Sequence, residues 1–387
     1  MKIGIVLPSV PAYSETFFTS KIKGLQANGF EVVLFVNHFS TKTSLNCSIV
    51  SSPKFSKNKI KNSFVSLYCF LKALFLGYTS TRKLYLLDKK DNLPFAKRIK
   101  SIIINSAILT QKLDWLHFGF GTMAINRENV AEAIGAKMGV SFRGFDHYVY
   151  PLKNVDCYKI LFSKKVKYHV LSEGMKSDLM NQLIPEENII KITPAIDTQL
   201  FFSNNRFEDK PIFLTVARLH WIKGLDYILE AFSILNKRGF DFQYKIIGDG
   251  AEKERLQFLV HQLELNNKVV FLGKLGHEEV KQELLKTSYY IQYSHQEGFC
   301  NAVLEAQAMG KICIVSDADG LIENVINEET GFIVSKRNPE VLANKIEAVF
   351  NLNYESKEIL IEKEVERIKS NFTFEKQINQ FMDFYTN

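Results

Sequence analysis

Short apolar runs alternate with amphipathic stretches along almost the whole chain. In the first half the apolar runs are expected to be strands, at residues 2–8, 31–37, 115–120, 140–144, 168–172 and 189–194. Helical periodicity appears between several of them, near residues 16–28, 122–138 and 173–183. Alternating buried strands and helices are typical of parallel sheets that helices cover on both faces. The pattern therefore predicts an α/β protein.

The second half repeats this alternation more regularly. Its expected strands are residues 212–217, 244–248, 269–273, 289–294, 313–317 and 331–334, and helical stretches separate most of them. Between the halves, residues 202–210 show neither period. We therefore expect two doubly wound, Rossmann-like domains, at 1–202 and 203–370, facing a cleft. The last segment, 371–387, has spaced aromatic residues that need a surface, and we expect its helix to cross back to the first domain.

Length and composition agree with this organisation. A chain of 387 residues exceeds one ordinary domain, and 46% apolar residues describe a globular protein. The opening residues, MKIGIVLPSV, lack the basic region and cleavage site of a secretory signal. Five scattered cysteines without C-x-x-C spacing fit reduced thiols better than disulfides or a metal site. We expect a cytoplasmic protein.

Positive charge is concentrated in one segment. Residues 51–112 contain thirteen basic and two acidic residues, a net charge of +11, whereas the whole chain carries +7. An anionic partner is expected near this segment, and both nucleic acid and the cytoplasmic membrane face are candidates. The apolar run at 64–77 is too short to span a bilayer, which needs about 20 residues. It suits either a helix at a membrane surface or a core helix with a solvated basic face, and nucleic acid is the least favoured partner.

Charged side chains follow two strands of the second half. Arg218 and Lys223 come after the strand at 212–217, at the start of the next helix. Glu297 follows the strand at 289–294, and Glu305 lies within the apolar helix after it. Isolated charges of this kind are usually solvated surface groups. Here Arg218, Lys223 and Glu297 follow strands, where doubly wound sheets bind ligands, and Glu305 lies in a helix that is apolar nearly all round.

These residues can hold a phosphorylated sugar. Two cations at a helix N-terminus suit a diphosphate. Gly298 allows close backbone approach, and free amides around Phe299 to Asn301 can bind phosphate or sugar oxygens. Carboxylates accept hydrogen bonds from vicinal diols. We expect Glu297 and Glu305 to face the cleft and to bind a sugar and a ribose.

The order and spacing of several motifs add a resemblance. The stretches VARLHWIKG, IIGDG, VVFLGKL, EGFCNAVLE with its E-x7-E element, SDADGLIENV and ETGFIV lie between residues 213 and 334. Together they resemble the retaining nucleotide-sugar glycosyltransferases of family 4, which have the two-domain GT-B fold. The resemblance implies Arg218 and Lys223 on the donor diphosphate, Glu297 on the sugar hydroxyls and Glu305 on the ribose. It adds further donor-binding residues, Gly298, Phe299, Cys300, Asn301, Leu304, and near the base Gly248, Gly250, Lys274 and Leu275.

The first half resembles a subgroup that builds cell-surface polysaccharides, including exopolysaccharides of the colanic-acid type. The matching stretches are PSVPAYSETFF, LHFGFG, SFRGFDHY, LSEGMKSDL and ITPAID. Ser14, Glu15 and Gly119 are then expected on the acceptor side, and Asp146 matches the acid of the family's Gly-x-Asp element. Where many members have a His before that Gly, this chain has Arg143. No histidine is assigned a catalytic role.

The resemblance implies a reaction without an enzymic nucleophile, metal or cofactor. Such enzymes are thought to retain configuration by a same-face displacement in which the leaving diphosphate takes the acceptor proton. A UDP-hexose donor and a lipid-linked or oligosaccharide acceptor are favoured, with GDP-mannose as the alternative donor. A catalytically degenerate binding protein is a further alternative, which the presence of all four charged donor residues argues against.

A dehydrogenase is another reading of the chain. Gly119, Gly121 and Ala124 form a G-x-G-x-x-A motif between a strand and a helix. The motif follows a middle strand, and no acid stands close to twenty residues on, since Asp146 comes 25 residues after Gly121. We interpret it as tight packing between strand and helix that lines the acceptor side.

Overall fold

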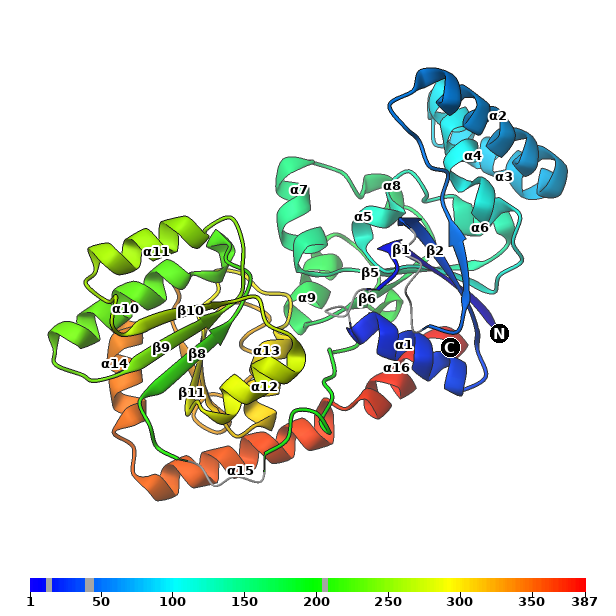
Figure 1. The fold of residues 1–387 in the computed structure, drawn as a ribbon. Coiled ribbons are helices and arrows are strands. Elements are labelled where there is room, and N and C mark those ends of the chain that lie inside the picture. Colours follow the sequence, from blue (N-terminus) through cyan, green and yellow to red (C-terminus); the bar gives the residue numbers. More distant parts are fainter. Residues whose placement is uncertain (12–15, 39–44, 204–207) are drawn as a thin grey trace. The chain divides into compact units, whose positions relative to one another are not determined.

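The structure, a computed structural model, describes residues 1–11, 16–38, 45–203 and 208–387. These form two compact units (Figure 1). Unit 1 comprises Met1–Ile192 and Ile378–Asn387, and unit 2 comprises Thr193–Gln377. Each unit is built around one parallel sheet with helices packed on it. The predicted α/β fold with two doubly wound domains is therefore confirmed.

The described strands of unit 1 form a seven-stranded sheet in the order β3-β2-β1-β4-β5-β6-β7, with every neighbouring pair parallel. Five consecutive residues of β1 are buried, as expected of a strand covered on both faces. The bounds are β1 Lys2–Ser9, β2 Glu31–His38, β3 Ser48–Ser51, β4 Trp115–Phe118, β5 Lys137–Ser141, β6 Val166–Val170 and β7 Ile189–Lys191.

The prediction of one helix in this unit is wrong. Residues 122–138 are not one helix, because they form two short helices and then the start of β5. Asn126 adopts a left-handed conformation, with φ of 62°, which no residue inside an α-helix can have. The helices and helical turns outside residues 51–112 are α1 Thr16–Ala27, α5 Gly121–Ala124, α6 Val130–Ile134, η1 Phe145–Val149, α7 Tyr150–Lys153, α8 Lys159–Phe162, α9 Glu173–Asn181 and η2 Glu186–Asn188.

The basic segment 51–112 folds largely into a three-helix module between β3 and β4. It consists of α2 Lys59–Leu76, α3 Tyr78–Lys90 and α4 Phe95–Leu109, which pack on one another while α3 and α4 contact α6 (Figure 1). In the described part of the chain no single helix is long and apolar enough to cross a membrane. Only α2 and α3 taken together pass that test, and they meet at a bend of 111°.

Unit 2 contains a six-stranded parallel sheet in the order β10-β9-β8-β11-β12-β13. The first strand, β8, lies inside the sheet, with β9 on one side and β11 on the other. The strand order therefore reverses between β8 and β11. The bounds are β8 Ile212–Val216, β9 Gln243–Ile247, β10 Val269–Gly273, β11 Tyr289–Gln292, β12 Ile312–Ser316 and β13 Phe332–Val334.

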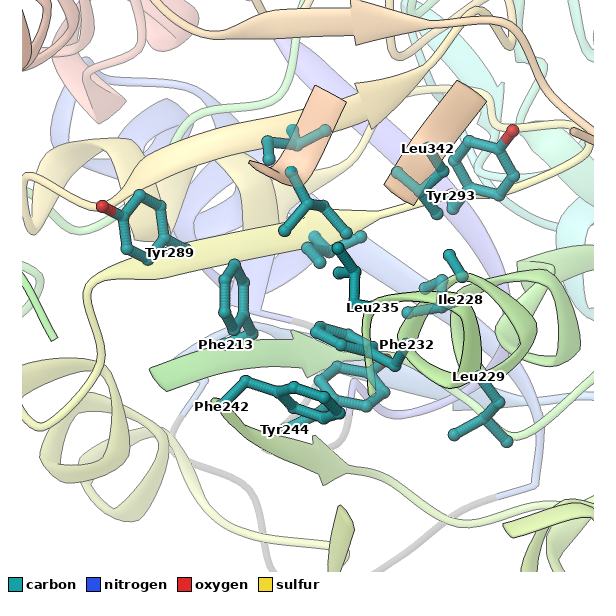
Figure 2. Close-up of a cluster of buried hydrophobic side chains, with 14 of the residues drawn as sticks. Phe213, Ile228, Leu229, Phe232, Leu235, Phe242, Tyr244, Tyr289, Tyr293 and Leu342 are labelled. Atoms are coloured by element: carbon teal, nitrogen blue, oxygen red, sulfur yellow. The ribbon is translucent and has the colours of Figure 1, made fainter. Parts of the chain in front are cut away.

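Helices of unit 2 cover this sheet and bury a core rich in aromatic residues. Phe232 from α10 packs on Phe213 and Tyr244 from the neighbouring strands, and Leu342 from α14 joins the cluster (Figure 2). The helices and the turn before them are η3 Trp221–Lys223, α10 Leu225–Lys237, α11 Lys253–Gln262, α12 His277–Leu285, α13 Asn301–Ala308, α14 Pro339–Phe350 and α15 Tyr354–Asn371.

The chain passes between the units at points that differ from the expected boundaries. Unit 2 begins at Thr193, ten residues before the expected start, because residues after β7 already pack in it: the amide of Ile196 donates to the Phe372 carbonyl at 3.0 Å. The last helix, α16 Phe374–Thr386, begins in unit 2 and belongs to unit 1 from Ile378 onward. Within unit 1 the Tyr385 carbonyl accepts a 2.9 Å hydrogen bond from the Trp115 indole.

Candidate active site

The charged residues predicted from the sequence lie where the strand order of unit 2 reverses. Arg218 and Lys223 follow β8, and Glu297 follows β11, its neighbour in the sheet. Ligands of doubly wound sheets bind beyond the carboxyl ends of the strands at such a reversal. The fold therefore brings both charged loops to one edge of one sheet.

Gly224 lets these two loops touch. Its backbone is left-handed, with φ of +59°, and a side-chain carbon there would overlap the carbonyl oxygen of Tyr293. Beside this contact the amide of His295 donates a 2.8 Å hydrogen bond to the carbonyl of Ile222. The turn that carries Lys223 is thereby fixed against the loop that carries Glu297.

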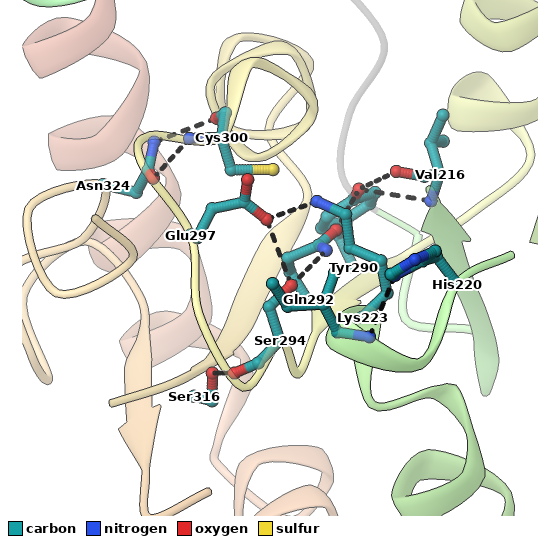
Figure 3. Close-up of polar contacts among 11 residues, drawn as sticks. Val216, His220, Lys223, Tyr290, Gln292, Ser294, Glu297, Cys300, Ser316 and Asn324 are labelled. Atoms are coloured by element: carbon teal, nitrogen blue, oxygen red, sulfur yellow. Dashed lines mark hydrogen bonds and ion pairs between the residues drawn. The ribbon is translucent and has the colours of Figure 1, made fainter. Parts of the chain in front are cut away.

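Lys223 and Glu297 form an ion pair in this junction (Figure 3). Their side chains are 13% and 15% exposed, so the pair is largely removed from water. Burial disfavours the ammonium, but the adjacent Glu297 carboxylate outweighs it, and the pKa of Lys223 lies above its ordinary value. The positive charge of Arg218 acts in the opposite direction, which shows that this exposed guanidinium lies within electrostatic reach.

A buried chain of hydrogen bonds supports the Glu297 carboxylate (Figure 3). Ser294 donates to Glu297 at 3.1 Å and accepts from the amide of Gln292 at 3.0 Å. Gln292 in turn accepts from the Tyr290 hydroxyl at 3.1 Å, and that hydroxyl accepts from the amide of Val216 at the end of β8. Tyr290, Gln292 and Ser294 are fully buried. The carboxylate is therefore held by buried groups that cannot form hydrogen bonds to water instead.

Sequence reasoning missed this chain, although a signal was present. Tyr290, Gln292 and Ser294 alternate along the run YYIQYS, so Tyr290 and Gln292 lie on one face of β11 and Ser294 continues the alternation just past its end. Polar residues at every second position of an otherwise buried strand need partners. That alternation points to a hydrogen-bonded network ending at the loop.

The start of α13 is braced from behind by Asn324. Its side-chain oxygen accepts from the Cys300 amide and its nitrogen donates to the Cys300 carbonyl, both at 3.0 Å. The expectation that the amide of Cys300 is free for a ligand is therefore wrong. Burial raises the pKa of the Cys300 thiol to about 12, which makes it unreactive. The side chains of Phe299 and Leu304 are also buried, the first against Phe372.

Asn301 and Gly298, on either side of Cys300 in the sequence, have different surroundings. Asn301 is the first residue of α13 and is partly exposed. Gly298 is buried against Gly320, whose amide donates to the Glu297 carbonyl at 3.1 Å. The backbone on both sides of Glu297 is thus fixed by a neighbouring loop.

Glu305 lies in the second turn of α13 and is partly exposed. Its carboxyl makes no hydrogen bond or ion pair to any described residue. Burial raises the pKa of Glu305 to about 8. Burial raises the pKa of Tyr290, and the charge of Glu305 adds to that effect. Among the described residues, Glu305 thus has no polar partner, whereas Glu297 is paired.

One more loop, after β9, meets the Arg218 loop at the same sheet edge. Side-chain carbons at Gly248 and Gly250 would overlap the carbonyl oxygens of Ala217 and Leu219, so only glycine permits this approach. These two glycines therefore position the loop that carries Arg218. Beyond them Lys274 is exposed and Leu275 is half-buried, next to the end of β10.

The candidate residues of unit 1 are described within that unit. Ser14 and Glu15 lie outside the described residues. A side-chain carbon at Gly119 would overlap Leu7, which favours tight packing as the reading of the G-x-G-x-x-A motif. The Arg143 guanidinium lies 3.7 Å from the ring centroid of Phe17.

Asp146 is 1% exposed and accepts from the Thr122 amide at 3.1 Å and the Thr122 hydroxyl at 2.7 Å, at the start of α5. Burial raises the pKa of Asp146 despite these bonds. Its second oxygen, Oδ2, is buried and has no hydrogen-bond partner among the residues that the structure describes.

The site of unit 2 can neutralise a dianion and accept hydrogen bonds from hydroxyls. Its charged side chains are two cations, Arg218 and Lys223, and two carboxyl groups, Glu297 and Glu305, and Lys223 is paired with Glu297. Within the described ranges there is no group of three or more His, Cys, Asp or Glu side chains that could hold a metal ion. A reaction without metal or cofactor stays a prediction.

Comparisons with known proteins agree with this geometry. Residues 197–367 match the family described as glycosyl transferases group 1. The capsular polysaccharide biosynthesis glycosyltransferase CapM of Staphylococcus aureus is 25% identical over 81% of this chain and 82% of its own length. Anabaena HepE, solved in complex with UDP and glucose, superimposes with a TM-score of 0.73 at 13% identity, covering 99% of this chain and 98% of that one. The protein is a glycosyltransferase with a group 1 domain in unit 2 and the two-domain GT-B fold.

Some relatives match over less of their length. An uncharacterized glycosyltransferase of Methanocaldococcus jannaschii is 28% identical over 50% of this chain, and the match spans about half, 51%, of that relative. The likeness is therefore densest in one part of the chain, and the family match places that part in unit 2.

Proposed function

We propose that this protein is a retaining hexosyltransferase that moves a sugar from a UDP-hexose to a lipid-linked or cell-surface polysaccharide acceptor. The observation that carries the proposal is the Lys223–Glu297 pair at the strand reversal of unit 2, with its buried hydrogen-bond chain. The polysaccharide role of CapM and the UDP and glucose bound by HepE support the acceptor and donor classes.

The cations stabilise the leaving group. As the bond from the sugar C1 to the diphosphate oxygen breaks, negative charge grows on the diphosphate, next to Lys223 and Arg218. The Lys223 ammonium has three donors, and Glu297 occupies one of them. The others are free to bind phosphate oxygens from a position that the pair has already fixed, so little reorganisation is needed.

The carboxyl groups hold the sugars of the donor. Only Oε2 of Glu297 is engaged in the described structure, by Lys223 and Ser294, which leaves Oε1 for a hexose hydroxyl. Glu305 has no polar partner among the described residues and is suited to the two ribose hydroxyls. We assign the hexose to Glu297 and the ribose to Glu305 because Glu297 has one oxygen already bound by the protein, whereas the Glu305 carboxyl has no partner among the described residues.

Retention requires no covalent intermediate on the protein. The acceptor hydroxyl attacks C1 on the face that the diphosphate leaves, a new C1–oxygen bond forms, and the hydroxyl proton passes to a diphosphate oxygen. On the acceptor side we assign Arg143 and Asp146, both after the carboxyl end of β5. Asp146 fixes the start of α5 through Thr122.

Incubation with single nucleotide sugars and a membrane extract tests this proposal. We expect free UDP and a sugar product whose anomeric configuration, measured by NMR, equals that of the donor. Release of GDP from GDP-mannose alone would support the alternative donor. No release from any donor, together with a thermal shift from UDP, would identify a binding protein instead. A thermal-shift screen with UDP, GDP and their sugars is sensitive enough, because a ligand at 100 times its Kd adds about 2.7 kcal/mol to stability.

A further inference from the structure

Helix α2 exposes a continuous apolar stripe. Its six members are between 40% and 81% exposed, and their spacing of three or four residues places them on one face of the helix: Ile60, Phe64, Leu67, Tyr68, Leu71 and Phe75. Large exposed apolar surfaces of this kind mark interaction sites. A helix that only completes the core of unit 1 would direct this face inward.

The opposite face of α2 already has its partner. Cys69 and Ala73 are buried where α2 packs on α4, and the Thr81 hydroxyl donates to the Ala73 carbonyl at 2.9 Å. The module is in turn attached to the rest of unit 1, because Lys83 donates to the Glu132 carbonyl at 2.7 Å. The stripe is therefore held outward by contacts on the other side of the helix.

The charge around the stripe has one sign. Both acids of residues 51–112 are engaged inside unit 1: Asp88 is 3% exposed and bound by Asn129, and Asp91 is paired with Lys164. The lysines and arginines of the module are mostly exposed, and Lys61 and Lys72 lie along one border of the stripe. The surface that α2 presents is apolar with a positive margin.

This combination fits a bilayer with anionic headgroups. Acyl chains take up the apolar side chains while lysines reach the phosphates above them. A second copy of the chain would bring two positive margins together, and nucleic acid offers no apolar layer for six large side chains. The helix lies in the surface and does not cross it, since α2 alone fails the length and composition test for a span.

We propose that α2 is a membrane-binding helix that lies in the plane of an anionic bilayer, with its apolar stripe among the acyl chains. The inference goes beyond the proposed reaction and does not depend on it, because binding needs no donor or acceptor. Its consequence for function is that a lipid-linked acceptor and unit 1 share one surface.

Sedimentation of the full chain with vesicles tests the proposal. We expect binding to vesicles of phosphatidylglycerol and phosphatidylcholine, weaker binding to phosphatidylcholine alone, and loss in 0.5 M NaCl. The double change Phe64→Ser and Phe75→Ser should lower the partition coefficient at least tenfold, because each removes several carbons from the apolar layer. Lys61→Gln should weaken binding to anionic vesicles about fivefold and leave binding to neutral ones unchanged.

Phe258→Ser is the matched control. Phe258 is 61% exposed on α11 of unit 2, comparable to Phe64 at 69%. Its loss should leave vesicle binding unchanged, and circular dichroism should show all variants folded. The proposal would be overturned if the α2 double variant bound vesicles as well as the parent chain does, or if the Phe258 variant lost as much binding as the α2 double variant. Absence of vesicle binding by the parent chain would also overturn it. So would a dimer of the parent chain that the α2 change dissociates.

Discussion

Unit 2 contains two buried Lys–Glu pairs that look alike and differ in their surroundings. Lys245 and Glu283 are 13% and 15% exposed, the same values as Lys223 and Glu297. Lys245 is on β9 and Glu283 on α12, so regular elements carry both partners. Glu283 is also bound by Lys286 at 2.7 Å. Neither oxygen of that carboxylate is left for a ligand.

The Lys223–Glu297 pair differs on each of these points. Its partners lie in the turn after β8 and the loop after β11, and one carboxylate oxygen has no partner among the described residues. A perturbed, buried ion pair is by itself only a candidate for function. What distinguishes the two pairs is unused bonding capacity at the reversal of strand order.

Replacing the lysine of each pair in turn should give the largest difference in kcat/KM between the catalytic pair and the structural pair. Lys223→Ala should lower kcat/KM at least 100-fold, because one donor to developing charge is worth about 3 kcal/mol. Lys245→Ala removes an equally buried ammonium and should leave kcat/KM within about threefold, since it touches no substrate. Steady-state kinetics on both variants measures the difference. Equal losses of activity would show that the pairs do not differ in role.

The glutamates of the two pairs can be compared in the same way. Glu297→Gln should lower kcat about 10- to 100-fold with little change in KM for the donor, because a hydrogen bond to a charged group is worth about 1.5–3 kcal/mol. Glu283→Gln is the matched variant and should keep kcat. A rise in KM without a fall in kcat for the Glu297 variant would place this carboxylate in ground-state binding instead.

Glu283, which is not expected to affect activity, should instead contribute to the stability of the protein. Desolvation opposes ionisation of Glu283, but its bonds to Lys245 and Lys286 outweigh it and lower its pKa. Stability from a lowered pKa is fully present above the unfolded value of about 4.5 and is lost as the pH falls through the folded value. Glu283→Gln should therefore cost about 3 kcal/mol of unfolding free energy at pH 7, as expected when a buried pair loses one partner, and the cost should shrink as the pH falls. Denaturant unfolding at pH 7 and pH 3.5 measures it, and a pH-independent cost would contradict this account.

Glu305 gives the smallest effect and a pH dependence. With a pKa of about 8 it is mostly protonated at pH 7, and the carboxylate that accepts ribose hydroxyls appears as the pH rises. Donor affinity, measured by calorimetry, should therefore increase from pH 7 to pH 9. Glu305→Gln should weaken affinity about tenfold at pH 9, as expected for one hydrogen bond to a charge, and remove the slope. A parallel slope in the variant would assign the titration to another group.

Sequence reasoning found the parts of this site that follow from chain order. Arg218, Lys223 and Glu297 could be placed because loops after neighbouring parallel strands must meet at one sheet edge. Which cation contacts which acid could not be deduced, because that depends on Gly224 closing the loops by tertiary contact. The engaged amide of Cys300 was missed for the same reason, since Asn324 is 24 residues away.

The fold was predictable where burial dominates and less so elsewhere. Strands covered on both faces are apolar throughout, and their runs were found with shifts of a few residues. The break at Asn126 was missed because a single left-handed residue interrupts a pattern that is otherwise helical. The apolar run within α2 did not distinguish core from surface, because periodicity does not say whether a partner exists.

The course of α16 sets the order in which the chain can fold during synthesis. Phe381, Phe384 and Tyr385 are buried in the core of unit 1 with Ile3 and Trp115. A ribosome therefore exposes all of unit 2 before it releases the residues that complete unit 1. The unit whose synthesis begins first is thus completed last, and removal of residues 378–387 would damage the unit that contains Met1.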